Sequence, residues 1–268
     1  ILVVVILLIG VMVYGTWSAR SAKVTNYDLK INKTAGNLKT LKVVMVSDIH
    51  LGSVVNNRRL TQMVNQINKL KPDIVLIPGD IIDSSLDPFV REKMGDNFKR
   101  LKSVYGLYAC LGNHDGMRSK VDEGVKVFNA AGINVLRDKA ILINNSFYLI
   151  GRDDISLQSQ TKVKRKELSY ITKDLDKSKP LLLMDHQPAN LGDAENQGID
   201  LQVSGHTHAG QLFPANIVTS LLFELDYGYL EKNNSNYIVS SGYGTWGPPI
   251  RLGSRCEIVE INIKFISK

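Results

Sequence analysis

Short apolar runs recur along this chain, and most of them end in a turn that carries an aspartate, an asparagine or a histidine. Residues 41–46, 73–77 and 105–111 are the first three such runs. Apolar runs of this length are typical of buried strands, and the intervening segments place apolar side chains at helical spacing. This alternation predicts an α/β domain in which at least the first three strands are parallel and helices cover the sheet.

The same pattern extends to the end of the chain. The expected strands are 41–46, 73–77, 105–111, 133–136, 140–143, 147–150, 180–184, 199–203 and 256–263, with a hairpin formed by 227–230 and 237–240, and the expected helices are 60–70, 121–131 and 164–175. Open α/β sheets bind ligands at the carboxyl ends of their strands. The polar turns that follow the strands are therefore expected to meet at one edge.

Five polar motifs stand at these strand ends, and four of them contain all five histidines of the chain. The motifs are Asp48-Ile49-His50, Gly79-Asp80, Gly112-Asn113-His114-Asp115, Asp185-His186 and Gly205-His206-Thr207-His208. Imidazoles, carboxylates and an amide oxygen form a mixed nitrogen and oxygen ligand set, which suits Mn, Fe or Zn and differs from a thiolate site. The set is large enough for two divalent metal ions, which would need a bridging carboxylate to relieve their mutual repulsion.

In order and spacing these motifs resemble those of the calcineurin-like metallophosphoesterase superfamily, over about residues 41–263. The matching series is Asp-x-His, Gly-Asp-x-x-Asp, Gly-Asn-His-Asp, an isolated histidine after a strand, and Gly-His-x-His. Residues 204–211 and 244–251 are also similar to the bacterial membrane-anchored branch, which includes phosphodiesterases and lipid A precursor pyrophosphatases. The resemblance implies a metallophosphoesterase-type β-sandwich flanked by helices.

The resemblance also implies a role for each residue of the motifs. The first metal would be held by Asp48, His50 and His208, and the second by Asn113, His186 and His206. Asp80 would bridge the two metals. His114 would stabilise the developing phosphoryl charge or protonate the leaving oxygen, and Asp83 would orient His114. Attack on phosphorus by a metal-activated hydroxide is the chemistry that such a pair of ions provides.

Simpler structural roles stay open for four of these polar residues. His186 could be a hydrogen-bonded histidine at a strand end, and Asp83 and Asp115 could cap loops. Arg251 could contact a substrate phosphate, but a solvent-facing or salt-bridged arginine is the simpler expectation.

The amino-terminal segment differs from the rest of the chain, because residues 1–17 contain no charged side chain. A membrane-spanning helix needs about 17–25 mainly apolar residues. Residues 1–20 are therefore expected to be a transmembrane anchor, truncated at its start because the chain begins at Ile1. A cleaved signal peptide is the alternative, although Tyr14 and Trp17 suit the interfacial belt of an uncleaved anchor. The polar residues 21–40 are expected to be a linker, and residues 41–268 the catalytic domain.

The membrane face on which the domain lies stays open. Arg20 and the lysines that follow it favour a cytoplasmic domain. The net charge of +7 is spread along the chain without an arginine-rich block, so no nucleic-acid partner is expected. Cys110 and Cys256 lie in apolar runs and are expected to be small buried residues, with a disulfide between them as the alternative.

Together these features predict a membrane-anchored, dinuclear-metal phosphohydrolase that cleaves a phosphodiester or pyrophosphate bond, with a lipid-linked or envelope molecule as one candidate substrate. One alternative is an enzyme that acts on a soluble nucleotide or phosphomonoester. Another is a non-catalytic, metal-stabilised membrane scaffold. Related protein phosphatases have Arg-Gly after the orienting aspartate, and this chain has Ser84-Ser85, which argues against a phosphoprotein substrate.

Overall fold

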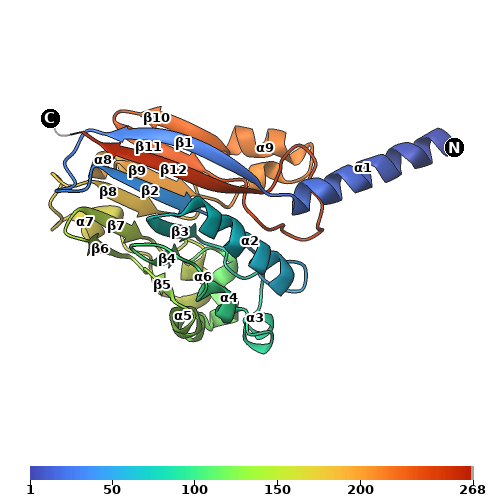
Figure 1. The fold of residues 1–268 in the computed structure, drawn as a ribbon, viewed down its shortest axis with the longest axis horizontal. Coiled ribbons are helices and arrows are strands. Elements are labelled where there is room, and N and C mark those ends of the chain that lie inside the picture. Colours follow the sequence, from blue (N-terminus) through green and yellow to red (C-terminus); the bar gives the residue numbers. More distant parts are fainter. Residues whose placement is uncertain (267–268) are drawn as a thin grey trace.

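Two six-stranded sheets pack face to face, helices cover their outer faces, and one further helix projects from the body (Figure 1). The computed structural model describes residues 1–266. Ser267 and Lys268, the last residues of the expected catalytic domain, lie outside the described residues. Val43 and Leu76 of the first sheet share one buried cluster with Leu182 and Val203 of the second. The expected α/β sandwich flanked by helices is confirmed.

The first sheet has the strand order β1-β12-β2-β3-β4-β5. Its strands are β1 (Lys23–Ile31), β2 (Thr40–Met45), β3 (Ile74–Pro78), β4 (Leu107–Cys110), β5 (Ile133–Val135) and β12 (Glu257–Phe265). Strands β2 to β5 are parallel, as the alternating pattern predicts, and β12 is antiparallel to β2. The loops after β2, β3 and β4 therefore leave the sheet at the same edge.

The second sheet has the order β10-β11-β9-β8-β7-β6. Its strands are β6 (Lys139–Ile143), β7 (Phe147–Gly151), β8 (Leu181–Met184), β9 (Leu201–Ser204), β10 (Gly228–Lys232) and β11 (Ser235–Val239). The inner strands are parallel, and the edge strands β6 and β10 are antiparallel to their neighbours. The predicted hairpin is present as β10 and β11, with Asn233 and Asn234 both at positive φ, the conformation that a tight hairpin turn requires.

The helices that cover the sheets are mostly short. They are α2 (Asn57–Leu70), α3 (Asp87–Arg91), α4 (Gly95–Phe98), α5 (Val121–Ala130), α6 (Leu157–Thr161), α7 (Leu168–Thr172), α8 (Leu191–Gln197) and α9 (Ala215–Leu222), with 3₁₀ turns η1 (His114–Ser119) and η2 (His208–Gly210). In α2, Leu60, Met63, Val64 and Ile67 form the apolar stripe that packs into the core. Asn56 caps this helix by accepting hydrogen bonds from the backbone of Arg58 and Arg59.

Two expectations about local structure are wrong. The expected linker 21–40 contains β1, which pairs in parallel with β12 over its whole length and buries Leu29 and Ile31. The helix expected at 164–175 shrinks to Leu168–Thr172. There, Lys166 N donates to Asp138 Oδ2 at 3.0 Å, so a contact with a distant residue holds the preceding backbone outside a helix. In both segments long-range pairing overrides a weak local pattern.

Helix α1 (Leu2–Arg20) projects away from the two sheets (Figure 1). Only Gly15, Ser18 and Ala19 of this helix are buried, and Gly15 O accepts a hydrogen bond from Arg251 N at 3.0 Å. Within residues 1–266, α1 is the one helix with the length and composition to cross a membrane. Its carboxyl end is thus attached to the body of the protein, while the rest of its apolar surface is exposed. Cys110 and Cys256 are free and buried.

Candidate metal centre

All seven predicted metal ligands meet at one edge of the sandwich, in the loops that follow β2, β3, β4, β8 and β9. These residues are Asp48, His50, Asp80, Asn113, His186, His206 and His208. The first four come from the first sheet and the histidines 186, 206 and 208 from the second. The centre therefore lies between the sheets, a position that the order of the motifs along the chain does not reveal.

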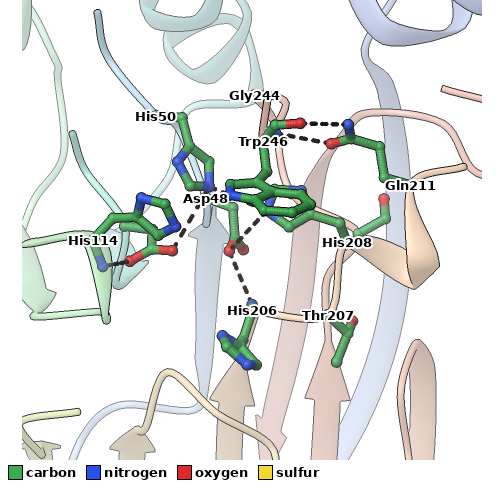
Figure 2. Close-up of polar contacts among 12 residues, drawn as sticks. Asp48, His50, His114, His206, Thr207, His208, Gln211, Gly244 and Trp246 are labelled. Carbon is green, nitrogen blue, oxygen red and sulfur yellow. Dashed lines mark hydrogen bonds and ion pairs between the residues drawn. The ribbon is translucent and has the colours of Figure 1, made fainter. Parts of the chain in front are cut away.

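The first group of side chains consists of Asp48, His50 and His208 (Figure 2). His50 Nε2 lies 3.1 Å from His208 Nε2, and His208 Nε2 lies 3.6 Å from Asp48 Oδ1. Asp80 Oδ2 approaches the same group, 3.7 Å from His50 Nε2. Ligands bound at about 2.0–2.2 Å with tetrahedral geometry stand about 3.3–3.6 Å apart, so this group has the dimensions of a metal site.

The second group consists of Asn113, His186 and His206, and it also lies next to Asp80. His186 Nε2 lies 3.3 Å from Asp80 Oδ2 and 3.0 Å from Asn113 Oδ1. His206 Nδ1 lies 2.9 Å from Asn113 Oδ1. One carboxylate oxygen of Asp80 is therefore close to an imidazole of each group, which is the position that a bridging ligand must occupy.

Unsatisfied polar atoms indicate that the centre is built for cations. Asp48 Oδ2 is buried, and among the described residues no donor contacts it. The buried nitrogens His50 Nε2 and His208 Nε2 face each other, and only one proton fits between them. A buried polar atom without a partner is costly, and coordination to a metal would relieve that cost. The side chains that are present thus fit two divalent ions.

The electrostatics of the centre favour the metal-binding protonation state at Asp80, His206 and His208. They do not at His50, where burial opposes protonation but the nearby Asp83 and Asp80 carboxylates raise the pKa. Burial opposes ionisation of Asp80, but the imidazoles of His186 and His50 reverse this and lower its pKa, so the carboxylate is charged. Burial also lowers the pKa of His206 and, more strongly, of His208. Both are therefore neutral, the form in which an imidazole binds a metal. Burial opposes protonation of His186 too, but Asp80 raises its pKa, so a cation would compete with a proton there.

The backbone at the centre is unusual. Left-handed φ angles occur at five of the seven predicted ligands: Asp48, His50, Asp80, His206 and His208. Such angles are uncommon outside glycine and cluster at functional sites. The motif glycines allow the accompanying close packing, because a Cβ on Gly205 would lie 2.0 Å from Asp48 Oδ2 and one on Gly112 would lie 2.2 Å from Asp80 Oδ1.

His114 lies beside the first group, with its ring edge-on to that of His50 at a centroid distance of 4.7 Å. Its backbone N–H donates to Asp80 Oδ1 at 2.8 Å, and its Nδ1 contacts the backbone carbonyl of Asp83. A carbonyl can only accept, so Nδ1 carries a proton, and Nε2 is the ring nitrogen left to face a ligand. The His114 ring is thus oriented by main-chain contacts.

The Asp83 carboxylate is placed differently from the expectation, because it faces His50, a predicted metal ligand. Asp83 Oδ1 lies 3.5 Å from His50 Nδ1, and this contact with His50 lowers the pKa of Asp83. Carboxylates often hold the second nitrogen of a metal-binding imidazole in this way. Asp83 therefore orients His50 through its side chain and His114 through its carbonyl.

Asp115 is a loop cap, the simpler of the roles considered for it. Its buried carboxylate accepts hydrogen bonds from the backbone of Gly112 at 2.9 Å, Ile81 at 2.9 Å and Ile82 at 3.2 Å. These contacts join the loop that carries Asp80 to the loop that carries Asn113. Asp115 thus supports the metal centre without pointing at it.

Arg251 is fully buried, so the expectation of a solvent-facing or salt-bridged arginine is wrong. Its guanidinium donates to the carbonyls of Ser241 at 2.6 Å and Gly244 at 2.7 Å, and Nη2 lies 3.2 Å from His208 Nδ1. Burial lowers the pKa of Arg251 to about 10, which leaves it charged at neutral pH. The sequence contains no signal for this role, because the acceptors are backbone carbonyls that any residue could supply.

We expect Arg251→Lys to destabilise the protein. Lysine cannot reproduce the forked geometry and leaves buried carbonyls without donors, which costs about 2–4 kcal/mol and lowers Tm by about 5–10 °C. Thermal unfolding of the full chain in detergent measures the change. Arg58→Lys, at an exposed position, is the matched control and should leave Tm unchanged. An unchanged Tm in Arg251→Lys would contradict the structural role.

The sandwich and the candidate metal-binding groups at its edge are those of an α/β metallophosphoesterase fold. The family model for calcineurin-like phosphoesterases matches residues 41–210. The chain belongs to the calcineurin-like phosphoesterase family, as its motifs predict.

Relatives in other organisms share most of this chain. A "Transmembrane protein with metallophosphoesterase domain" from Danio rerio is 31% identical over 94% of this chain, and an "Uncharacterized metallophosphoesterase" from Aquifex aeolicus is 33% identical over 90%. The matches cover 60% of the Danio rerio protein and 92% of the Aquifex aeolicus protein. The chain thus spans about three fifths of the vertebrate relatives, with 57% for the one from Bos taurus.

Among solved structures, the NAD nucleotidase of Haemophilus influenzae has the same type of fold. It superposes with a TM-score of 0.51 and 19% sequence identity, covering 76% of this chain and 51% of its own. At this identity the likeness concerns the fold alone.

Proposed function

We propose that this chain is a phosphohydrolase that uses two divalent metal ions to cleave a phosphodiester or pyrophosphate bond. The observation that carries the proposal is the position of Asp80 Oδ2, 3.7 Å from His50 Nε2 and 3.3 Å from His186 Nε2. A carboxylate that lies between two ligand groups can bridge two ions, whereas a single ion would need only one of the groups. Family membership supports the same conclusion.

When bound, two divalent ions would neutralise phosphate charge and lower the pKa of a water molecule. Asp48, His50 and His208 would hold one ion, Asn113, His186 and His206 the other, and Asp80 would bridge them. His114, whose Nδ1 is held by the Asp83 carbonyl, would direct Nε2 at the substrate. In the doubly protonated form of the ring, in which Nε2 also carries a proton, His114 would donate a hydrogen bond to the phosphoryl group or a proton to the leaving oxygen. Asp83 would keep His50 oriented.

A metal-dependent hydrolysis assay tests this proposal. Purified chain in detergent, stripped with a chelator and reloaded separately with Mn²⁺, Zn²⁺ or Fe²⁺, is expected to hydrolyse bis(p-nitrophenyl) phosphate only after reloading, with about two ions bound per chain. Binding to the folded state also stabilises it, so the reloaded protein should melt about 5 °C or more above the stripped protein. Stabilisation by metal without any hydrolysis would favour the non-catalytic scaffold.

We further propose that α1 anchors the chain in a membrane and that the substrate is lipid-linked. The exposed apolar surface of α1 supports the anchor, as do the relatives described as transmembrane proteins. The backbone hydrogen bond from Arg251 N to Gly15 O joins α1 directly to the domain. Such an anchor would keep the metal centre near the bilayer and raise the effective concentration of lipid substrates.

The anchor predicts that alkaline carbonate leaves the full chain in the membrane pellet. The double variant Val4→Asp/Leu8→Asp should move largely to the supernatant, since each charge near the centre of a span costs about 2.5–3.5 kcal/mol. Val104→Asp, at an apolar position outside α1 that is at least as exposed, is the control and should stay in the pellet. Release of the unaltered chain would contradict the anchor, and a mature amino terminus near Ala22 would reveal a cleaved signal peptide.

Kinetics on a panel of substrates tests the lipid-linked part. Lipid pyrophosphates and phosphodiesters in mixed micelles are expected to give higher kcat/KM than soluble nucleotides or phosphomonoesters. A preference for the soluble compounds, unaffected by micelles, would instead support an enzyme whose anchor serves only for localisation.

A further inference from the structure

Helix α9 exposes its apolar side chains to the solvent. Ile217, Val218, Leu221 and Leu222 are 50%, 54%, 81% and 72% exposed, and no residue of α9 is buried. The side that faces the protein is polar, because Thr219 Oγ1 donates to Asp226 Oδ2 at 2.7 Å. A surface helix normally has the opposite arrangement, with its apolar stripe against the core.

Two aromatic side chains extend this apolar face. Phe213, just before α9, is 63% exposed, and Trp246 is 59% exposed. Gln211 connects them by donating to Trp246 O at 2.6 Å and accepting from Trp246 N at 2.8 Å (Figure 2). We call the set of Phe213, Ile217, Val218, Leu221, Leu222 and Trp246 the α9 surface. A group of exposed apolar side chains of this kind indicates an interaction site.

The α9 surface adjoins the carboxyl end of α1. Leu252 O accepts from Phe213 N at 2.7 Å, and the neighbouring Arg251 N donates to Gly15 O at 3.0 Å. Figure 1 shows α9 beside the base of α1, at the same end of the sandwich. At that base Trp17 lies under the guanidinium of Arg255, 4.5 Å from its ring centroid, a pairing of aromatic and basic groups that suits a headgroup region.

We propose that the α9 surface docks onto the bilayer in which α1 is anchored, so that its apolar side chains enter the interfacial region. This inference rests on the proposed anchoring by α1. Residues around Gly15 mark where α1 leaves the protein body, so a membrane that surrounds the exposed part of α1 meets the loop of residues 250–252 and α9 first. An apolar helical face at that depth is typical of segments that lie in the interface plane.

Docking in this way would hold the metal centre at the depth of the lipid headgroups. Phe223, the residue that ends α9, makes an edge-on ring contact with His206 at a centroid distance of 6.2 Å. Arg251, which is joined to α1, lies against His208. Both contacts connect the proposed membrane surface to residues of the metal centre, so a headgroup phosphate would need little displacement to reach it.

The two tryptophans of the chain provide a test that does not depend on catalysis, because Trp17 lies in α1 and Trp246 in the α9 surface. The full chain is reconstituted into phosphatidylcholine vesicles in which the lipids are brominated near the headgroup end of the acyl chain. In Trp17→Phe, emission from Trp246 is expected to fall about twofold or more relative to unbrominated vesicles. In Trp246→Phe, quenching of Trp17 reports the anchor itself.

The outcomes separate the two proposals. Quenching of Trp17 without quenching of Trp246 would overturn docking and leave the anchor standing. Absence of quenching at both positions would overturn the anchor, and docking with it. If Trp246 escapes quenching in vesicles but is shielded from aqueous acrylamide in native membranes, the α9 surface binds a protein instead, which also overturns the proposal.

A variant of α9 tests the surface directly. In the Trp17→Phe background, Leu221→Asp/Leu222→Asp should abolish most of the quenching of Trp246. Both positions are highly exposed, so folding should be retained, as the unchanged metal content and Tm would verify. Val104→Asp, 71% exposed and located before β4 at the opposite ends of the strands, is the matched control and should leave quenching intact. Equal quenching in both variants would exclude α9 as the docking element.

Discussion

Asp80→Asn is expected to lower kcat/KM by at least about 10³-fold, the largest effect of any single conservative change in this chain. The substitution keeps the shape of the side chain and removes its charge. Asp80 Oδ2 is the oxygen near both His50 Nε2 and His186 Nε2, so the two cations would lose the negative group placed between them. Metal content should fall from about two ions per chain to one or fewer.

The measurement combines hydrolysis of bis(p-nitrophenyl) phosphate with elemental analysis of the purified full chain. Circular dichroism should show an unchanged fold, because the amide can still accept the hydrogen bond from His114 N. Asp174→Asn, at an exposed position on the α7 side of the molecule, is the control for loss of one negative charge and should be fully active. Wild-type activity in Asp80→Asn would end the two-metal proposal.

His114→Ala is expected to lower kcat by about 10²–10⁴-fold while both metal ions stay bound. The His114 ring is oriented by the carbonyl of Asp83 and has Nε2 available, so its removal takes away a donor to the substrate. His206→Ala is the informative comparison. His206 contacts Asn113 Oδ1 within the second ligand group, so its loss should reduce metal content as well as activity.

The choice of leaving group sharpens the test of His114. A p-nitrophenolate leaves without a proton, whereas an alkoxide needs one, so His114→Ala should impair an alkyl phosphodiester at least about tenfold more than an activated aryl diester. Equal losses on both substrates would indicate that His114 stabilises phosphoryl charge instead of protonating the leaving oxygen. Loss of metal comparable to that in His206→Ala would make His114 a ligand and contradict the assignment.

Much of the fold is predictable because its signals are local. The apolar run before Asp48 and the helical spacing of Leu60, Met63 and Ile67 each predict one element, and each element is present. β1 has a local signal only in its second half, where Tyr27, Leu29 and Ile31 alternate with polar residues. Its first half, residues 23–26, is mostly polar and is a strand through its pairing with β12. The backbone before α7 is likewise held by a distant carboxylate, that of Asp138.

The candidate site also has a part that local motifs predict and a part that they do not. The seven predicted ligands follow five strands, and each stands in a motif at the end of one strand, so a single motif is enough to nominate it. The partners of the ligands are not predictable in this way. The approach of the Asp83 carboxylate to His50, and the burial of Arg251 against His208, depend on loops far apart in sequence. Neither contact leaves a pattern in the residues around it.

The sequence by itself determined which candidate oxygen and nitrogen ligands this protein has, that they stand at strand ends, and that an apolar segment precedes them. These properties are local, since a strand, a turn and a charge-free run are each read within a few residues. Only the tertiary structure decided that two sheets bring the ligands together around Asp80, and that α9 presents its apolar face beside α1. Such arrangements arise from packing and pairing between distant segments, whose free energy is shared among many residues and is encoded at no single position.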